Sequence, residues 1–119
     1  MENHMRPPGK TTIAPEVLIN IAKLSALSVP GVNRLGLASG DVNRIFKGVT
    51  NEGVRITVEN DVVNADLFVI MNKDVNVRDV SRAIQAHVTR AISEMVGMEV
   101  GKINVHVEDI EYSIPEDPA

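Results

Sequence analysis

The sequence predicts an α+β fold with two layers, a small mixed β-sheet and two helices packed on one face of that sheet. Two segments have the three-and-four spacing of amphipathic helices. A third segment alternates apolar and polar residues on both sides of Asn60-Asp61, which is the pattern of a β-hairpin. Strands and helices are mixed along the chain, which is typical of a two-layer α+β domain. With 119 residues and 44% hydrophobic side chains, the chain can bury one core and is too short for two domains.

The chain divides into three parts by composition. Residues 1–10 are polar and contain two prolines, which predicts a disordered leader. Residues 11–112 hold every periodic segment and are expected to form the single domain. Residues 113–119 are acidic and bounded by prolines, so we expect a solvated tail there.

The first helix is predicted to begin at Pro15, because proline fits the first turn of a helix and Glu16 is favourable beside the positive end of its dipole. A short strand is expected before it, from Lys10 to Ile13. The sequence Val29-Pro30-Gly31 ends the helix, and a short extended piece follows over 32–37. The expected apolar face consists of Val17, Leu18, Ile21, Ala22, Leu24, Ser25 and Leu27.

The middle of the chain contains an irregular segment and the hairpin. Residues 36–53 are rich in glycine, which favours a surface excursion, with Val42, Ile45 and Phe46 able to pack one helical turn onto the core. The hairpin turns at Asn60-Asp61. Its first strand turns Val54, Ile56 and Val58 inward, and its return strand turns inward Val63, Ala65, Leu67, Val69 and Met71. The other face of the return strand carries Asn64, Asp66, Phe68 and Ile70.

The second helix has both of its end signals. Asn76 and Asp79 have the spacing of a capping box, and Gly97 is suited to a left-handed C-cap. A last strand runs from Lys102 to about Ile110, with Ile103, Val105 and Val107 on one face. The core stripe expected for the helix consists of Val77, Val80, Ile84, Val88, Ala91, Ile92 and Met95.

Composition and charge exclude several classes of protein. There is no cysteine, so disulfides, thiolate metal sites and a cysteine nucleophile are excluded. No apolar run approaches the ~18 residues that span a bilayer, and the charged, proline-containing start is unlike a signal peptide. Residues 1–90 have a net charge of +2 and residues 91–119 a net charge of −6. This acidic end repels phosphate and makes nucleic acid an unfavourable partner. The three aromatic residues are too few for a base-stacking surface.

No catalytic, cofactor-binding or metal-binding residue is expected. The leader contains Gly9-Lys10-Thr11 but lacks the remaining glycine and the preceding strand of a phosphate-binding loop. His4, His87 and His106 do not have the spacing of zinc ligands. The carboxylates Asp61, Asp66, Asp74, Asp79, Glu94 and Glu99 each have a structural use in turns, caps and solvated faces. The serines lack the nucleophile-elbow motif of hydrolases.

One polar stripe of the second helix has two interpretations. It is either the solvated side of an amphipathic helix, which is the commoner case, or a docking stripe for an anionic partner or RNA. A KH-type RNA module needs a GXXG loop, whereas the glycine pairs at 36/40 and 97/101 are each one residue too far apart. The stripe consists of Arg78, Arg82, Gln85, Thr89 and Ser93.

The ordered set of short motifs resembles the alkaline shock protein family, the envelope stress response proteins of bacteria. The first half is similar through Ile13, Glu16-Val17-Leu18, Ile21-Ala22 and Val29-Pro30-Gly31-Val32. The second half is similar through Gln85, Val88, Met95-Val96-Gly97 and Asn104-Val105-His106-Val107. The resemblance covers residues 11–112.

This resemblance implies a non-enzymatic, cytoplasmic protein of cell-envelope homeostasis. It also implies self-association into a homo-oligomer and membrane association through a small anchor protein. No site residue is carried over, because the family has no established catalytic residues. A small KH-like RNA-binding regulator is the alternative. From the residues themselves we expect self-association through sheet edges or through the apolar part of the hairpin at Phe68 and Ile70. Cover of these two residues by the 36–53 segment is the alternative explanation. Neither helix has the basic amphipathic character needed to adsorb directly to a membrane.

Overall fold

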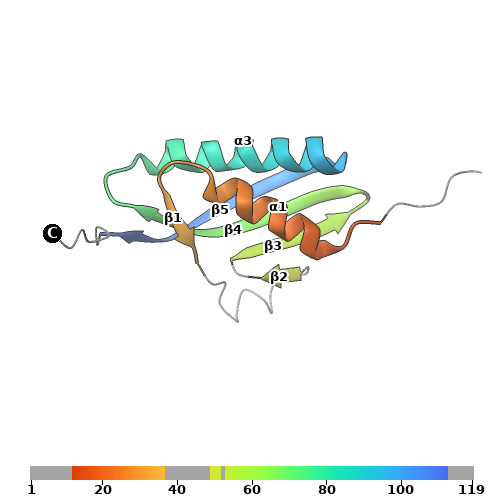
Figure 1. Ribbon diagram of the computed structural model, residues 1–119, viewed down its shortest axis with the longest axis horizontal. Helices are drawn as coiled ribbons and strands as arrows, with labels where there is room; N and C mark the ends of the chain where they lie inside the picture. Colours follow the sequence, from red (N-terminus) through yellow and green to blue (C-terminus); the bar gives the residue numbers. More distant parts are fainter. Residues whose placement is uncertain (1–11, 37–48, 52, 113–119) are drawn as a thin grey trace, which may run out of the picture.

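One long central strand organises the fold in the computed structural model, which describes residues 12–36, 49–51 and 53–112. The expected leader, the tail and the helical turn at 42–46 lie outside these residues. The elements in chain order are α1 (Pro15–Leu27), β1 (Val32–Leu35), β2 (Val49–Asn51), β3 (Val54–Glu59), β4 (Val62–Asn72), α3 (Val77–Val96) and β5 (Glu99–Glu111). Figure 1 shows α1 and α3 packed over the same face of the sheet, so the predicted two-layer α+β fold is confirmed.

The sheet is mixed, as predicted, because β4 has one parallel and two antiparallel neighbours. β5 runs parallel to β4 along its whole length. On the opposite edge, β3 pairs antiparallel with the first half of β4 and β1 pairs antiparallel with its last residues. β2 extends the sheet beyond β3. The helix α3 therefore serves as the crossover that a parallel connection from β4 to β5 requires.

The predicted hairpin is confirmed in its turn and in its register. Asn60 and Asp61 both have positive φ, 55° and 66°, as a two-residue turn between twisted strands requires. The expected inward residues of β4, Val63, Ala65, Leu67, Val69 and Met71, are fully buried. The strict alternation of β4 therefore places one whole face in the core. On β3, Val54 and Ile56 are buried as expected, but Val58 was expected inward and is 44% exposed, near the end of the strand.

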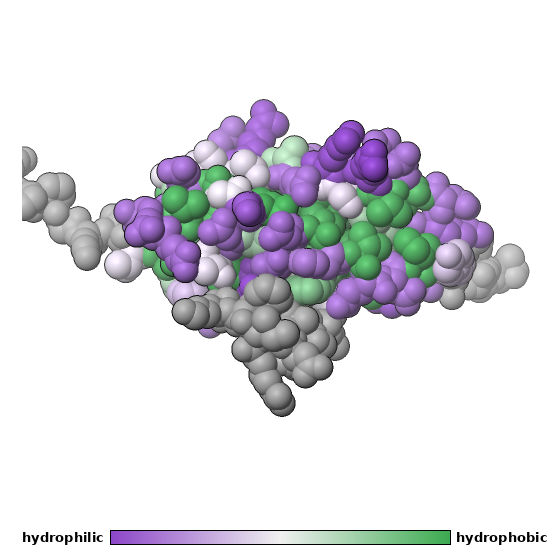
Figure 2. All heavy atoms as spheres, turned by 180° about the vertical axis from the view of Figure 1, so that it is seen from behind, coloured by the Kyte–Doolittle hydropathy of each residue, from purple (hydrophilic) through white to green (hydrophobic). Residues whose placement is uncertain are grey.

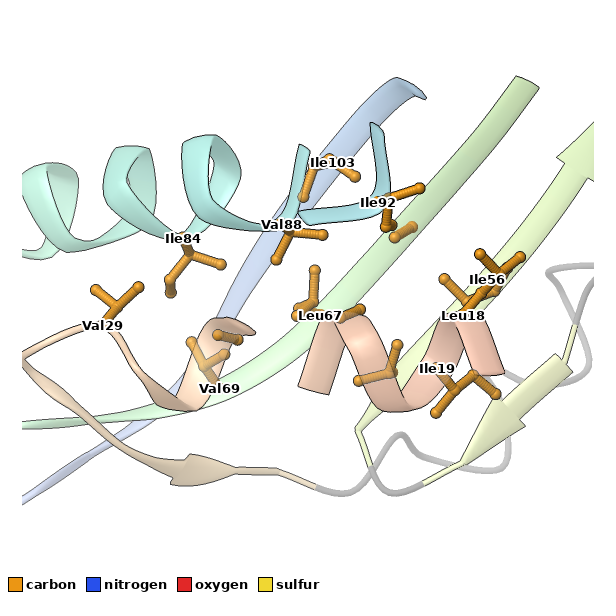
Figure 3. Packing of buried hydrophobic residues seen from close by; sticks show 14 of the residues in the cluster. Leu18, Ile19, Val29, Ile56, Leu67, Val69, Ile84, Val88, Ile92 and Ile103 are labelled. Carbon is orange, nitrogen blue, oxygen red and sulfur yellow. The ribbon is translucent and has the colours of Figure 1, made fainter. Parts of the chain in front are cut away.

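The core lies between the sheet and the two helices. Figure 3 shows Ile84, Val88 and Ile92 of α3 pointing toward Leu67 and Val69 of β4. Leu18 and Ile19 of α1 complete this cluster from the second helix. Four-residue spacing along α3 keeps its core residues on one side, since 3.6 residues make one turn.

Both end signals of α3 are confirmed, but two of its expected core residues are not. The Asn76 Oδ1 accepts a hydrogen bond from the Asp79 backbone N–H at 3.0 Å, and Gly97 is left-handed with φ of 78°. Val77 and Met95 were expected in the core and are 40% and 71% exposed. They lie on the core side of the helix but in its first and last turns, where less of the neighbouring layer covers them.

The predicted face of α1 is partly wrong. Leu18 and Ala22 are buried as expected, together with Ile19 and Ala26. Val17 and Leu24 are instead 44% and 67% exposed, and Leu27 is also exposed. Apolar residues occur almost all round this helix, so their spacing alone could not indicate which side faces the sheet.

Three further expectations need correction. Thr12 and Ile13 are not in a strand, although a strand was expected up to Ile13. The 36–53 segment was expected to be irregular, yet it contributes β2, which pairs with β3. Val107 was expected on the buried face and is 37% exposed. The register shifts there, because Val69 pairs with Val107 but Ile70 pairs with Asp109, and a bulge of this kind re-aims side chains.

Candidate functional site

The sheet face turned away from the helices carries a polar cluster centred on Asp66. One carboxylate oxygen lies 2.8 Å from Nη2 of Arg55, whose side chain is only 3% exposed. The other oxygen lies 2.9 Å from Nε2 of His106 and accepts a hydrogen bond from Asn104 Nδ2 at 3.2 Å. The cluster therefore joins β3, β4 and β5 across the sheet.

The register of the strands places these side chains together. Arg55 is the cross-strand partner of Asp66 in the hairpin, and Asn104 is its partner in β5. His106 is the register partner of Phe68, and the two rings are stacked with centroids 4.7 Å apart and planes 15° from parallel. A buried guanidinium facing one carboxylate is the form in which arginine is tolerated in a protein interior.

This arrangement corrects the expectation that Phe68 is an exposed apolar contact. Phe68 is 5% exposed, so it does not offer the contact that was expected of it, whereas Ile70 is half-buried. Figure 2 shows this side of the molecule as a mixture of hydrophilic and hydrophobic residues. Its polar share includes Asp66 and His106, which a water-facing sheet surface can keep hydrated.

The Asp66 cluster consists of polar contacts that link three neighbouring strands. An Asp–His pair can serve a nucleophile, but the serines that the structure describes, Ser25, Ser28, Ser81 and Ser93, all lie in or next to the helices. The cavity described below has no wall in this cluster. We therefore assign it a role in holding the three strands in register.

The histidines are not brought together. His106 lies on the sheet, whereas His87 lies on α3 with its Nδ1 3.5 Å from Ser28 Oγ. His4 lies outside the described residues. Within residues 12–36, 49–51 and 53–112, no group of three or more His, Asp or Glu side chains is arranged to hold a metal ion.

The polar stripe of α3 is exposed along its whole length. Arg78, Arg82, Thr89 and Ser93 are solvent-exposed. Gln85 is exposed too, but its Nε2 donates a hydrogen bond to the Ile103 carbonyl at 3.0 Å, which fixes α3 against β5. One member of the stripe thus has a structural use, and the four others form the solvated side of the helix.

The outer surface of the helical layer carries large apolar side chains. Leu24 and Val17 of α1 are 67% and 44% exposed. Val17 and Leu24 are seven residues apart, which places them on the same side of α1, two turns from each other. Exposed apolar residues gathered in this way mark contact surfaces more often than scattered ones do.

One end of the molecule has a cavity of about 630 Å³. Figure 1 shows that the start of α1, the β3–β4 turn and the end of α3 meet at this end. Two carboxylates, Asp61 and Glu99, belong to its lining. The apolar part of the lining consists of Ile13, Pro15, Leu18, Val58, Val96 and Met98.

Sequence reasoning missed Arg55 and the cavity for different reasons. With a two-residue turn at Asn60-Asp61, counting back along both strands places Arg55 opposite Asp66, so this pair could have been found from the sequence. The cavity combines residues from three separate parts of the chain, and no local pattern signals it.

Neither helix in the described residues is long and apolar enough to cross a bilayer.

Comparison with known sequences identifies relatives over most of the chain. The profile of the alkaline shock protein 23 family, described as having a cell envelope-related function, matches residues 3–112. The Bacillus subtilis protein named "Uncharacterized protein YqhY" is 28% identical over 106 residues, which are 87% of this chain and 78% of that protein. The Streptococcus pyogenes protein named "Uncharacterized protein Spy1535" is 32% identical over 103 residues, with 86% and 79% covered.

Solved structures share the fold at low sequence identity. A structure titled "MamM CTD - Copper form" superposes with a TM-score of 0.58 at 18% identity, covering 87% of this chain and 94% of that chain. A second MamM CTD structure in a copper form has a TM-score of 0.51 at 17% identity, with 82% and 100% covered. At this level of identity the likeness shows the fold alone.

Proposed function

Because this chain belongs to the alkaline shock protein 23 family, whose function is cell envelope-related, we propose that it is a non-enzymatic protein of cell-envelope homeostasis. It works by associating with copies of itself and by binding a protein partner at the membrane. It resides in the cytoplasm and reaches the inner face of the membrane through that partner. The family match over residues 3–112 is the observation that carries the proposal.

The exposed apolar surface of α1 supports self-association with a second copy. If two α1 helices pack antiparallel about a two-fold axis, Val17 of one copy lies against Leu24 of the other. Glu16 then lies beside Lys23 of the second copy, because these two residues are also seven positions apart on a shared flank. In a symmetric dimer both contacts occur twice. The charge pattern is therefore complementary to itself in this orientation.

We expect the purified protein to sediment as a species larger than the 12.9 kDa monomer. The Leu24→Glu substitution should shift it toward the monomer, because a charge would be buried at the contact. Analytical ultracentrifugation over micromolar concentrations measures this. Tyr112→Ser is the matched control, since Tyr112 is 70% exposed at the end of β5. A strict monomer at high micromolar concentration would contradict self-association.

The partner route to the membrane is tested by flotation. Protein-free anionic liposomes should leave the protein at the bottom of the gradient, whereas membranes from the cell should carry it upward. Mild protease treatment of those membranes before mixing should abolish that binding, since it removes the partner. Salt-sensitive co-flotation with the liposomes would instead indicate direct binding through Arg78 and Arg82. Reproducible recovery of RNA crosslinked to the same two residues would favour the RNA-binding alternative.

A further inference from the structure

The cavity at the end of the molecule combines an apolar wall with negatively charged side chains. Its two charged lining residues are Asp61 and Glu99, and no Lys, Arg or His is among the lining residues that the structure describes. Glu59 does not line the cavity but lies at the same end of the sheet, because it pairs with Val62, which pairs with Glu99. Three carboxylates therefore occupy this end of the strands.

The end of α3 adds to this negative charge. The negative end of a helix dipole usually has a basic side chain nearby. The last turn of α3 has none, and it ends at the cavity through Val96 and Gly97. A Cβ built on Gly97 meets no atom within 4 Å, so the space over this helix end is open. A cation placed there gains from both the carboxylates and the helix end.

The shape and polarity of the site restrict its occupant further. Its apolar lining fits a hydrocarbon side chain, and its volume of about 630 Å³ is within the range of ligand-binding clefts. Val58 lines the cavity and is still 44% exposed, so the apolar surface continues out of the cavity to solvent. An occupant that fills the site is therefore longer than one small cation.

We propose that this cavity binds a segment of a partner protein in which a basic residue stands beside aliphatic residues. The aliphatic side chain enters between Leu18, Val58 and Met98, and the basic group lies against Asp61 and Glu99. This inference rests on the proposed function, because the segment would belong to the partner that holds the protein at the membrane. It adds the chemistry by which that partner is recognised.

The test is a titration of the full chain with a defined probe, followed by two-dimensional NMR of the backbone amides. The probe is the capped peptide Gly-Ser-Leu-Arg-Leu-Ser-Gly, and its counterpart has Glu in place of Arg. We expect saturable shifts at Asn60, Gly97 and Met98 with the first peptide and none with the second. Shifts centred elsewhere, equal binding of both peptides, or no saturable shift up to millimolar concentration would overturn the proposal.

Variants that remove carboxylates distinguish binding at the cavity from non-specific attraction between the basic peptide and the acidic protein. The double variant Asp61→Asn with Glu99→Gln should weaken peptide binding about fivefold to thirtyfold, given ~0.5–1 kcal/mol for each exposed charge pair. The control is Asp74→Asn with Glu108→Gln. Asp74 has a positive φ of 67°, as Asp61 has 66°, and lies in the turn that leads from β4 into α3. Equal weakening in both double variants would overturn the assignment.

A third ligand identifies the class of occupant. Arginine amide should bind at least tenfold more weakly than the peptide, because it lacks the aliphatic neighbours. If it binds as tightly, the cavity is a site for small cations and the docking proposal is wrong. The flotation experiment does not use the peptide. Failure of the peptide to bind would therefore overturn the cavity proposal and leave the proposed membrane association through a partner untouched.

Discussion

Gly31 lies between α1 and β1 with a φ of 103°, and a Cβ there would come 2.8 Å from Cγ2 of Val80. Because valine is stiff at χ1, the helix α3 would have to move. Gly97 also has a positive φ but has open space around it. We expect Gly31→Ala to destabilise the protein by about 3 kcal/mol, and Gly97→Ala by about 1 kcal/mol from backbone strain alone. Urea unfolding measures both, and equal losses would contradict the close approach of Gly31 to α3.

Asp66 connects three strands, so its removal tests how β3, β4 and β5 are held together. Asp66→Ala removes both the carboxylate that pairs with the buried Arg55 and the acceptor of the Asn104 hydrogen bond, and this should cost about 2 kcal/mol. Asn104→Ala, at the exposed rim of the same cluster, should cost less than about 1 kcal/mol. Adding Arg55→Met to Asp66→Ala should recover part of the loss, since no buried charge then remains. If the double variant is no more stable to urea than Asp66→Ala alone, the buried Arg55 guanidinium is not the source of the loss in stability.

At the scale of the whole molecule, the two proposed contact surfaces do not overlap. The proposed dimer contact uses Glu16, Val17, Lys23 and Leu24, none of which lines the cavity, and the cavity touches α1 only at Pro15 and Leu18. Leu24 is the member of that contact farthest along α1 from the cavity. We therefore expect Leu24→Glu to leave the affinity for the arginine peptide within about twofold, and the Asp61/Glu99 double variant to leave the sedimentation unchanged. A variant that abolished both properties would show that dimer formation builds the cavity.

The sequence predicts elements well where a local pattern is unambiguous. The Asn60-Asp61 turn, the alternation of β4 and both ends of α3 have such patterns, and the structure confirms them. The exposed side of α1 could not be predicted, because apolar residues surround that helix and only packing decides which of them are buried. Met95 shows the same limit, since its position on the core side of α3 does not reveal where the layer beneath the helix ends.

The contact surfaces were less accessible to prediction than the fold. Phe68 reads as exposed from its place beside Asn64 and Asp66, yet it is buried and stacked on His106. Only the register of β5 against β4 brings these two rings together. The cavity likewise depends on how three chain ends meet in space. Contacts between residues that are far apart in the sequence leave no pattern in the local spacing of residues, so they could not be predicted from it.

Of the strands in the described residues, the parallel strand β5 is the last to leave the ribosome. β4 is complete at Asn72, but its partner β5 begins only at Glu99, after the whole of α3. During synthesis the nascent chain therefore has an eleven-residue strand, apolar on its core face, with one edge open until β5 emerges. The hairpin and α1 can form earlier, since they use contacts already synthesised. Translation of the final stretch is thus the step at which the domain closes, and stalling before Glu99 would leave a chain ready to pair with the wrong strand.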